Sequence, residues 1–543
     1  MTNKINHEMK LKVYTNLIII FLGVLAISCA IPSTQDQAED YIIGDAPAIN
    51  IHVNQEDINN GNLSLEELIK KGELLFKASF NTLDGAGRPE AADVDRRNNV
   101  SINNRRPRHE FPDNFNRISG PDANSCLDCH GIPRMGGGDS NATNVFVLAD
   151  RIAFANFDGK QGDNNENHTL KTIGNERTSI GLFGSGWIEL IAREMTTDLK
   201  SQAEKAINEA KSKNANISKH LVTKGVSFGT IIARPDATID FSALEGIDKD
   251  LVIRPFQQKG TIVSLREFGV KAMNSHFGMQ PSEQFRDGID FDKDGYSDEL
   301  TRGDLTALVA FQATLPVPGT ILPNNDKAKK AVNKGRVLFQ DIGCVSCHIP
   351  ELRVDNPVFT EPSPFNPRGK LQPTDVNNPL KIDLTKEGAG PHLKREADGS
   401  VLVPAFTDLK RHKMGPLLNN EVVIEAGVPT DEWITRKLWG FASEPPFLHH
   451  GRATLISEAI LAHGGEAKLA RDRFDNLPDT QKSEIVEFLK TLQVMPESNQ
   501  TPQSNTHKAS TDIGFIALAG GLIGLIIILL TSSIIILIRR ITG

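Results

Sequence analysis

The chain has few cysteines, few tryptophans and tyrosines, and no surplus of positive charge. Its 543 residues include only 5 Cys, 3 Trp and 3 Tyr, whereas Phe occurs 26 times. The scarcity of Trp and Tyr argues against long aromatic relay chains. The formal net charge of −8 offers no basic surface of the kind that binds nucleic acid. The length allows two or three domains, and 24% charged with 39% hydrophobic residues is typical of a globular protein.

Four of the five cysteines lie in two copies of the pentapeptide C-x-x-C-H, at Cys126–His130 and Cys344–His348. In this pattern the two cysteines bond covalently to the vinyl groups of a haem, and the histidine binds its iron. A zinc knuckle and a redox dithiol are the alternatives, but neither explains both histidines. The sequence therefore predicts electron transfer through two c-type haems, held by Cys126, Cys129, His130, Cys344, Cys347 and His348.

The same helical opening precedes both motifs, because Lys71–Phe76 (KGELLF) matches Lys334–Phe339 (KGRVLF). The Leu/Phe pair on one face of each helix would pack on a porphyrin edge. Helices are also expected at Leu65–Lys77, Thr197–Lys213, Gly303–Thr314 and Ser483–Leu492, whereas strand signals are sparse. We therefore predict a mainly α fold with two cytochrome c-like haem domains and long loops, over residues 65–325 and 326–495.

Both ends of the chain carry targeting signals. Residues 1–29 have the charged and apolar regions of a signal peptide, and Cys29 follows a sequence that resembles a lipoprotein box. An ordinary signal peptide is the alternative, and residues 30–64 are a linker. Residues 496–512 are a polar tether before Ile513–Ile538, an uncharged segment that would span about 39 Å as a helix. A cleaved sorting tail is the alternative to this transmembrane helix.

These signals predict where the protein works. Arginines directly after the apolar segment would keep the short tail inside the cell and the haem part outside. We therefore expect the protein at the periplasmic side of a bacterial inner membrane, held by the C-terminal helix and an N-terminal lipid.

The second axial ligand of each haem decides between an electron relay and an open, reactive iron. Candidates that follow the first motif are Met135, His168, Met195 and His276, and those that follow the second are His412, Met414, His449, His450 and His463.

An acidic loop before the second motif has the spacing of a calcium site. Carboxylates and one further group stand at alternate positions, with Gly295 at the sharp turn. The expected ligands are Asp290, Asp292, Asp294, Tyr296 and Asp298. Thr301 stands where an EF-hand has its bidentate Glu, and a solvated acidic turn is the alternative.

Several segments resemble a known family. They are GRVLFQDIGCVSCH, DLKRHKMGP, RKLWGFASEPPFLHHGRA, EAILAHGGEA, FGVKAMNSHFGMQ and DELTRGDLTALVAFQATLP. They are similar to bacterial di-haem cytochrome c peroxidases, and more so to the related di-haem oxidoreductases labelled thiol oxidoreductases. The resemblance covers roughly Gly72 to Leu492 and implies a calcium between the haem domains. It also implies that His463 replaces the methionine that ligates the second haem in peroxidases, with Met414 as the alternative.

Around the first haem the resemblance is weaker. Arg177–Met195 stands where peroxidases carry a distal glutamate. The resemblance therefore offers Glu189 and Glu194, with Arg193 nearby, as the acid–base groups that split peroxide. Trp187 would either relay electrons or pack a helix, and His450 replaces the aspartate of the family's FHDG segment.

The main hypothesis is a peroxidase-like di-haem enzyme that reduces hydrogen peroxide or a similar oxidant, with electrons from a donor cytochrome or cupredoxin passing through the second haem. A non-enzymatic di-haem carrier and a di-haem oxidase or oxygenase of an organic or protein substrate are the alternatives. Thiol chemistry has no support, because no cysteine is left for thiol exchange.

Overall fold

The computed structural model describes residues 44–86, 123–139, 143–144, 175–290, 295–421 and 424–496. The described residues up to Val494 form one compact unit. The predicted signal peptide with Cys29, most of the tether and Ile513–Ile538 lie outside the described residues.

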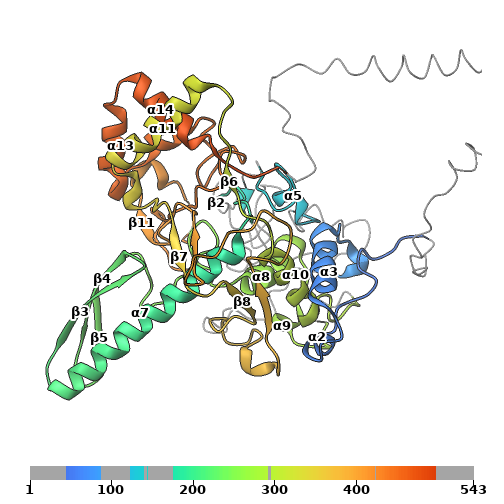
Figure 1. Cartoon of the computed structure of the whole chain (residues 1–543). Coiled ribbons are helices and arrows are strands. Elements are labelled where there is room, and N and C mark those ends of the chain that lie inside the picture. The colour runs from blue at the N-terminus through green and yellow to red at the C-terminus, as the bar shows by residue number, and fades with distance from the viewer. Residues whose placement is uncertain are drawn as a thin grey trace, which may run out of the picture. The chain divides into compact units, whose positions relative to one another are not determined.

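Helices and strands alternate along the described chain (Figure 1). The helices are α2 (Gln55–Asn59), α3 (Leu65–Lys77), α5 (Leu127–His130), α7 (Ser185–Lys213), α8 (Leu265–Phe277), α9 (Ser282–Phe285), α10 (Arg302–Ala313), α11 (Asp326–Asp341), α12 (Ile456–Ala462), α13 (Lys468–Asp475) and α14 (Asp479–Leu489). The antiparallel strand pairs are β1 (Thr143–Asn144) with β2 (Asn175–Glu176), β6 (Gly319–Thr320) with β13 (Leu492–Gln493), β7 (Leu352–Val354) with β10 (Val401–Val403), β8 (Val358–Glu361) with β9 (Leu380–Asp383), and β11 (Arg411–Lys413) with β12 (Glu432–Ile434).

The two predicted copies of the helical opening form equivalent helix pairs. Helix α3 packs on α10, and α11 packs on α14. A glycine lies at each crossing, since a Cβ built on Gly72 would be 2.0 Å from the Ala307 carbonyl oxygen and one on Gly335 would be 1.8 Å from that of Glu484. Both glycines therefore allow the two backbones to touch, and the internal repeat of the sequence is a repeat of structure.

The helix pairs contribute to separate hydrophobic cores. The first core includes Phe76 of α3 and Phe311 of α10, and the second includes Phe339 of α11 and Phe488 of α14. Strands β7 to β10 follow the second motif in sequence but pack into the first core through Val354 and similar residues. The chain after the second motif therefore contributes to the first core before it completes the second.

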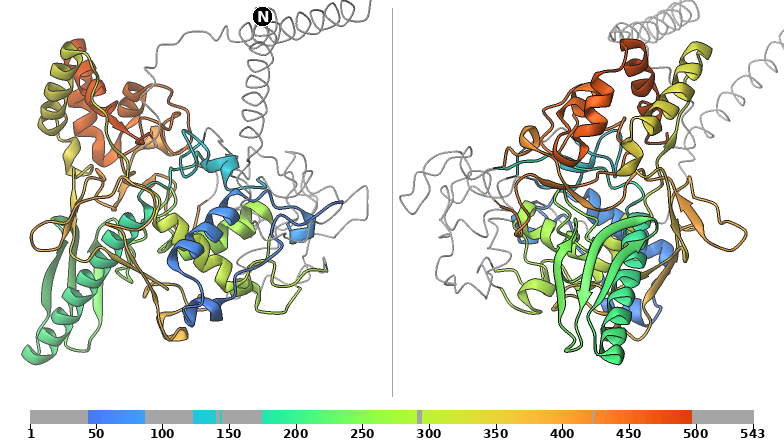
Figure 2. Two further views of the ribbon diagram at one scale, coloured as in Figure 1. Left: turned by 45° about the vertical axis from the view of Figure 1, so that its right-hand side comes forward. Right: turned by 90° about the vertical axis from the view of Figure 1, so that its left-hand side faces the viewer.

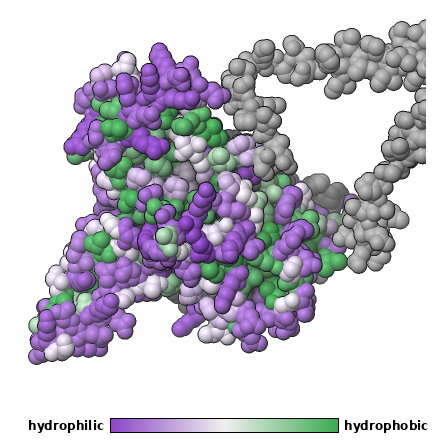
Figure 3. Space-filling view, in the orientation of Figure 1, coloured by the Kyte–Doolittle hydropathy of each residue, from purple (hydrophilic) through white to green (hydrophobic). Residues whose placement is uncertain are grey.

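Helix α7 and a three-stranded sheet form an arm that extends from the rest of this unit (Figure 2). The sheet has the order β3 (Ile217–Thr223), β4 (Val226–Ala233), β5 (Ile239–Leu244), and α7 packs against β3 and β4. The first half of α7 is buried, whereas only one side of its second half is. The visible surface of the arm is mostly hydrophilic (Figure 3).

The prediction of a mainly α fold is wrong, because the described chain mixes helices and strands throughout. The clearest strands that the sequence reading missed are β3 and β4, which join at Lys224-Gly225. Both residues have positive φ, 47° and 81°, as a two-residue hairpin turn requires. Each strand of the other pairs has only two to four residues, which is too few to show an alternating pattern of apolar and polar residues.

The prediction that a C-terminal helix holds the protein at a membrane is also corrected. None of the helices that the structure describes is long and apolar enough to cross a bilayer. The segment on which that prediction rested lies outside the described residues.

Candidate functional site

The first C-x-x-C-H motif forms the short helix α5. The carbonyl oxygen of Gly137 accepts a hydrogen bond of 2.9 Å from Nδ1 of His130. Because a carbonyl can only accept, Nδ1 carries the proton and Nε2 is free to bind a metal. Burial lowers the pKa of His130 to about 4, so the ring is neutral at physiological pH.

The second motif repeats this arrangement around the short 3-10 helix η3 (Cys344–Ser346). Nδ1 of His348 donates to the carbonyl oxygen of Phe406 at 3.1 Å, and burial lowers the pKa of His348 to about 4. Each histidine also lies against the phenylalanine of its helical opening. The ring centres of Phe76 and His130, and those of Phe339 and His348, are both 6.4 Å apart at 45°. The two motifs are thus held in the same way.

His463 faces His348 across the second pocket. Their ring centres are 6.5 Å apart. A metal–nitrogen bond of about 2.1 Å on each side, with about 1.1 Å from each nitrogen to its ring centre, would give about 6.4 Å. Nδ1 of His463 donates to the carbonyl oxygen of Ala459 at 2.7 Å, so its Nε2 is also free for a metal. This spacing would suit two histidines that hold one iron between them.

The other candidate ligands of the second haem differ in whether they line its pocket and in what their side chains contact. His412, Met414 and His449 line the same pocket as His463. Both ring nitrogens of His412 bond to carboxylates, Nδ1 to Glu466 at 2.7 Å and Nε2 to Asp408 at 2.8 Å. Burial lowers the pKa of His412, but the hydrogen bonds and charges of Asp408 and Cys347 outweigh it and raise the pKa to about 11. Because both of its ring nitrogens bond to carboxylates, His412 presents no nitrogen to an iron in this arrangement.

His449 is held in a stack. Its ring lies 3.5 Å from that of Trp433, at 16°, and its Nε2 is 2.7 Å from Oδ1 of Asn420. His450 is buried, and its Nδ1 accepts a hydrogen bond from the backbone of Arg452. Of these candidates, His463 is the one whose ring faces that of His348.

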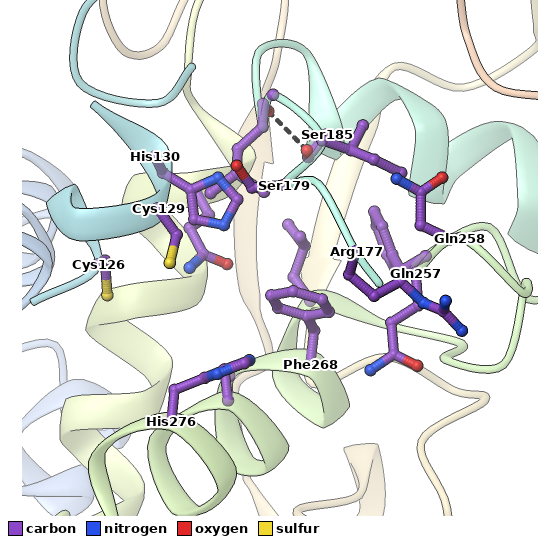
Figure 4. Close-up of a pocket in the computed structure, with 18 of the residues that line it drawn as sticks. Cys126, Cys129, His130, Arg177, Ser179, Ser185, Gln257, Gln258, Phe268 and His276 are labelled. Atoms are coloured by element: carbon purple, nitrogen blue, oxygen red, sulfur yellow. Dashed lines mark hydrogen bonds between the residues drawn. The ribbon is translucent and has the colours of Figure 1, made fainter. Parts of the chain in front are cut away.

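The pocket around His130 is faced by helix α8 (Figure 4). Figure 4 shows His276 and Phe268 projecting from α8 into this pocket, across from His130. Between them on the same helix face lie Gly269 and Ala272, which also line the pocket. Gly269 and Ala272 are small, so the middle of this helix fills less of the pocket than Phe268 and His276 do.

The four first-haem candidates can now be separated. His276 lines the pocket. Met195 is buried in the first core and Met135 packs against it, and neither lines the pocket. His168 lies outside the described residues. His276 is therefore the candidate that the fold brings to the first haem site.

The two pockets share a wall. Gln258, Ile434, Thr435 and Arg436 line both. Nη2 of Arg436 bonds to Glu444 at 3.1 Å, whereas its buried Nε has no hydrogen-bond partner among the described residues. Next to it, burial lowers the pKa of Lys437 to about 8. A buried guanidinium with a donor to spare suits the negative propionate groups of a haem.

Trp433 lies beside this wall in a cluster of charges. Nζ of Lys259 is 3.8 Å from its ring centre, and the guanidinium carbon of Arg177 is 5.1 Å away. Both cations pair with buried Glu421. Trp187, which the sequence offered as a relay or a packing residue, lines neither pocket and is buried in the first core.

Both pockets fit a haem. Each combines a C-x-x-C-H motif with a mostly apolar lining, and the empty space, including the open mouth, is about 1580 Å³ in the first and about 1790 Å³ in the second. Cys126 and Cys129 line the first pocket, and Cys344 and Cys347 line the second. The donor set that two covalent haems require is therefore present in both places.

The glutamates that the resemblance suggested for acid–base chemistry lie away from this pocket. Glu189 is fully buried, bonds to Arg193 through one oxygen and accepts the Leu265 backbone N–H at 2.8 Å through the other. Glu194 pairs with Lys224 at 2.6 Å and accepts backbone hydrogen bonds from residues 355 and 356. None of Glu189, Arg193 and Glu194 lines the first pocket. Their catalytic role stays a prediction, and the contacts described here are structural.

Only part of the predicted calcium loop is described. Asp292 and Asp294 lie outside the described residues. Asp290 accepts the Gly295 N–H at 3.0 Å, and Asp298 accepts the Gly288 N–H at 2.8 Å. The one described group of side chains with metal-site spacing is Cys347, Asp408 and His412, and Cys347 belongs to the haem motif. Calcium stays a prediction.

Two residues of the site were missed from the sequence. Arg436 is the first residue of the resemblance segment RKLWGFASEPPFLHHGRA, but nothing in its pattern shows that two pockets share it. Glu466 follows His463 by three residues, and its bond to His412 depends on a fold that brings distant segments together. The signal that the sequence offered for Glu466 is that a charged residue stands close to the candidate ligand His463.

Comparisons with known proteins agree with the predicted resemblance. Residues 381–492 match the family model "Di-haem oxidoreductase, putative peroxidase". No curated protein matches. Two solved structures are similar to parts of the chain. Hydrazine synthase of Kuenenia stuttgartiensis has 16% identity, with 44% of this chain and 68% of that chain covered at a TM-score of 0.26. A MauG-like protein associated with microbial copper homeostasis has 14% identity, with 56% and 89% covered at a TM-score of 0.23. The resemblance predicted from the sequence is thus confirmed, since residues 381–492 match the model of the di-haem oxidoreductase family.

Proposed function

We propose that this protein is a peroxidase-like di-haem c-type oxidoreductase. The first haem, at Cys126–His130, reduces peroxide or a similar oxidant, and the second, at Cys344–His348, relays the electrons. The observation that carries this proposal is the difference between the two pockets. In the second pocket the ring of His463 lies 6.5 Å from that of His348, whereas the helix that faces the first pocket carries Gly269 and Ala272 beside His276.

The second site suits a relay. With His348 and His463 as axial ligands, the iron would have no position left for a substrate, and its ligands would not change during electron transfer. A His/His iron has a lower potential than a His/Met iron, so it is the stronger electron donor toward the first haem.

The first site suits reaction with peroxide. When bound, a haem iron with an open position accepts peroxide and supplies electrons for breaking its O–O bond. Reduction of hydrogen peroxide to two waters needs two electrons and two protons. His276 is a titratable side chain in this pocket that can pass a proton to the departing oxygen. Arg177 and Lys437 also line the pocket, and their positive charge favours a developing oxyanion.

Electrons would cross the wall that both pockets share. Ile434, Thr435 and Arg436 are consecutive residues that line both sites, so the path between them is short and covalently connected. A small redox protein, a cytochrome or a cupredoxin, would supply the electrons at the second haem. The predicted calcium loop at Asp290–Asp298 is part of this proposal, and a fall in bound calcium after Asp292→Ala with Asp294→Ala would test it.

His276 also supports a second candidate function. If its imidazole ligated the first iron, both haems would be six-coordinate and the protein would be a di-haem electron carrier. An oxidase or oxygenase of an organic or protein substrate would use the same open first site and differs only in what enters it.

Peroxide turnover distinguishes these functions. We expect the haem-loaded protein to consume hydrogen peroxide with a reduced small cytochrome as donor. The variant His276→Ala should be at least about 100-fold slower, the contribution of one general acid. His220→Ala is the control, because His220 lies exposed on β3 and lines neither pocket. If His276→Ala instead gains peroxide activity that the unaltered protein lacks, the carrier hypothesis is correct.

A further inference from the structure

We propose that Glu466 and His412 are positioning residues that hold His463 in place opposite His348. Together with the segment Phe406–Lys413 they form a brace that sets the spacing between the two sides of the second haem site. This inference rests on the proposed role of His463 as an iron ligand.

The brace touches both sides of the second site. At one end, the carbonyl oxygen of Phe406 accepts the Nδ1–H of His348 at 3.1 Å. At the other end, Glu466 accepts the Lys413 backbone N–H at 2.9 Å through Oε1 and bonds to His412 through Oε2 at 2.7 Å. A single stretch of chain therefore contacts the proximal histidine directly and the distal histidine's turn through one carboxylate.

Glu466 is tightly coupled to His463 through the chain. Only Gly464 and Gly465 lie between them, and α12 ends at Ala462. These glycines lie against the brace. A Cβ built on Gly465 would be 2.0 Å from the carbonyl oxygen of Lys413, and one on Gly464 would be 2.8 Å from that of Met414. A change in the position of Glu466 would therefore move the turn that carries His463.

His412 is itself fixed from the opposite side. Its Nε2 bonds to Asp408 at 2.8 Å, and Asp408 also accepts the Lys410 N–H at 2.9 Å. The imidazole thus links two carboxylates, one within the brace and one on the turn of His463. Charge-assisted hydrogen bonds of this kind are stronger than neutral ones. His412 and Asp408 are largely shielded from water, whereas the side chain of Glu466 is 48% exposed.

The brace also decides between the two ligand candidates. Met414 follows it directly, lines the same pocket, and has its backbone N–H bonded to the carbonyl oxygen of Asp431 at 2.8 Å. While the bond between Glu466 and His412 is intact, the turn keeps His463 at the ligand distance from His348. When the bond is broken, His463 can leave and Met414 is the nearest replacement.

Ligand displacement on the full haem-loaded chain tests this inference. Cyanide is titrated into the oxidised protein while electron paramagnetic resonance follows the bis-imidazole low-spin signal of the second haem. In Glu466→Ala, the cyanide concentration that halves this signal should fall about 10- to 100-fold, the worth of a hydrogen bond to a charged group. Glu487→Ala is the matched control, because Glu487 pairs with exposed Lys490 at 2.6 Å and does not line the second pocket.

Further variants keep the test decisive if the alanine variant does not fold. Glu466→Gln keeps an oxygen for the Lys413 N–H and removes only the charge, so we expect a smaller shift in the same direction. His412→Gln breaks the same bond from the other side. The effect of the double variant should be smaller than the sum of the single effects, since both remove one interaction.

The outcomes separate this inference from the ligand assignment. If His463→Ala abolishes the bis-imidazole signal but Glu466→Gln and His412→Gln titrate like the unaltered protein, the brace is wrong and the ligand is right. If His463→Ala leaves the signal unchanged, His463 is not the ligand, and the brace, which rests on that assignment, is wrong as well. A charge-transfer band of a His/Met haem in Glu466→Ala would support both, with Met414 as the new ligand.

Discussion

A buried charge cluster between α7, α8 and β8 should make the stability of the protein fall as the pH rises. The cluster holds three carboxylates and two guanidiniums, and these side chains are Glu189, Arg193, Arg266, Glu283 and Glu361. Arg266 is fully buried and pairs with both Glu283 and Glu361. One carboxylate is therefore in excess. Burial raises the pKa of Glu361 to about 7, although Arg266 lowers it, and Oε2 of Glu361 has no hydrogen-bond partner among the described residues.

The raised pKa of Glu361 determines how the stability of the protein changes with pH. Below pH 4.5, Glu361 is protonated in the folded and the unfolded state. Between 4.5 and about 7 only the folded state keeps the proton, so stability declines across this window and levels off above it. A difference of about 2.5 pKa units corresponds to about 3 kcal/mol of unfolding free energy. Glu361→Gln keeps the oxygen that accepts from Arg266 and removes the titration.

Thermal unfolding at pH 5 and pH 8 measures the loss of stability that the ionisation of Glu361 causes. We expect the melting temperature of Glu361→Gln, relative to that of the unaltered protein, to be clearly higher at pH 8 than at pH 5. Glu487→Gln, on the surface, should show no such change. If the difference between Glu361→Gln and the unaltered protein is the same at both pH values, Glu361 is ionised in the folded state throughout and the reasoning is refuted.

Two further predictions concern the repeat and the haem attachment. Gly335→Ala should lower the melting temperature by an amount that corresponds to at least 1–3 kcal/mol, because its Cβ would meet the Glu484 carbonyl oxygen; Gly269→Ala, whose Cβ would have its nearest neighbour at 3.6 Å, should not. The denatured protein should keep its haem stain on a gel, and replacing Cys344 and Cys347 by serine should halve that stain; complete loss of stain on acid–acetone extraction would contradict covalent attachment.

Much of the helical framework could be predicted from the sequence. Helix α3 has the predicted bounds, because Ser64 caps its start with Glu67 and its apolar residues recur on one face. The repeat was visible because the same six-residue pattern serves the same packing at Gly72 and Gly335. Such signals are local in sequence and need no knowledge of partners.

The strands and the acid–base residues could not be predicted in this way. Strand β7 pairs with β10, about 50 residues further along, and three residues show no period on their own. The sequence does not show whether the side chain of Glu189 faces a haem or Arg193. Its place was decided by the side of α7 that turns toward α8 and β8, which is a property of tertiary packing.

The central claim is that one haem is closed and the other open, and the electron paramagnetic resonance spectrum of the half-reduced protein tests it most directly. We predict one low-spin haem with two imidazole ligands in the oxidised protein, ascribed to His348 and His463, and a second haem that is high-spin or becomes so on half-reduction and then binds cyanide. His463→Ala should remove the low-spin signal and leave cyanide binding at the first haem intact. Two low-spin haems in both states, with no cyanide binding, would contradict the account and identify the protein as an electron carrier.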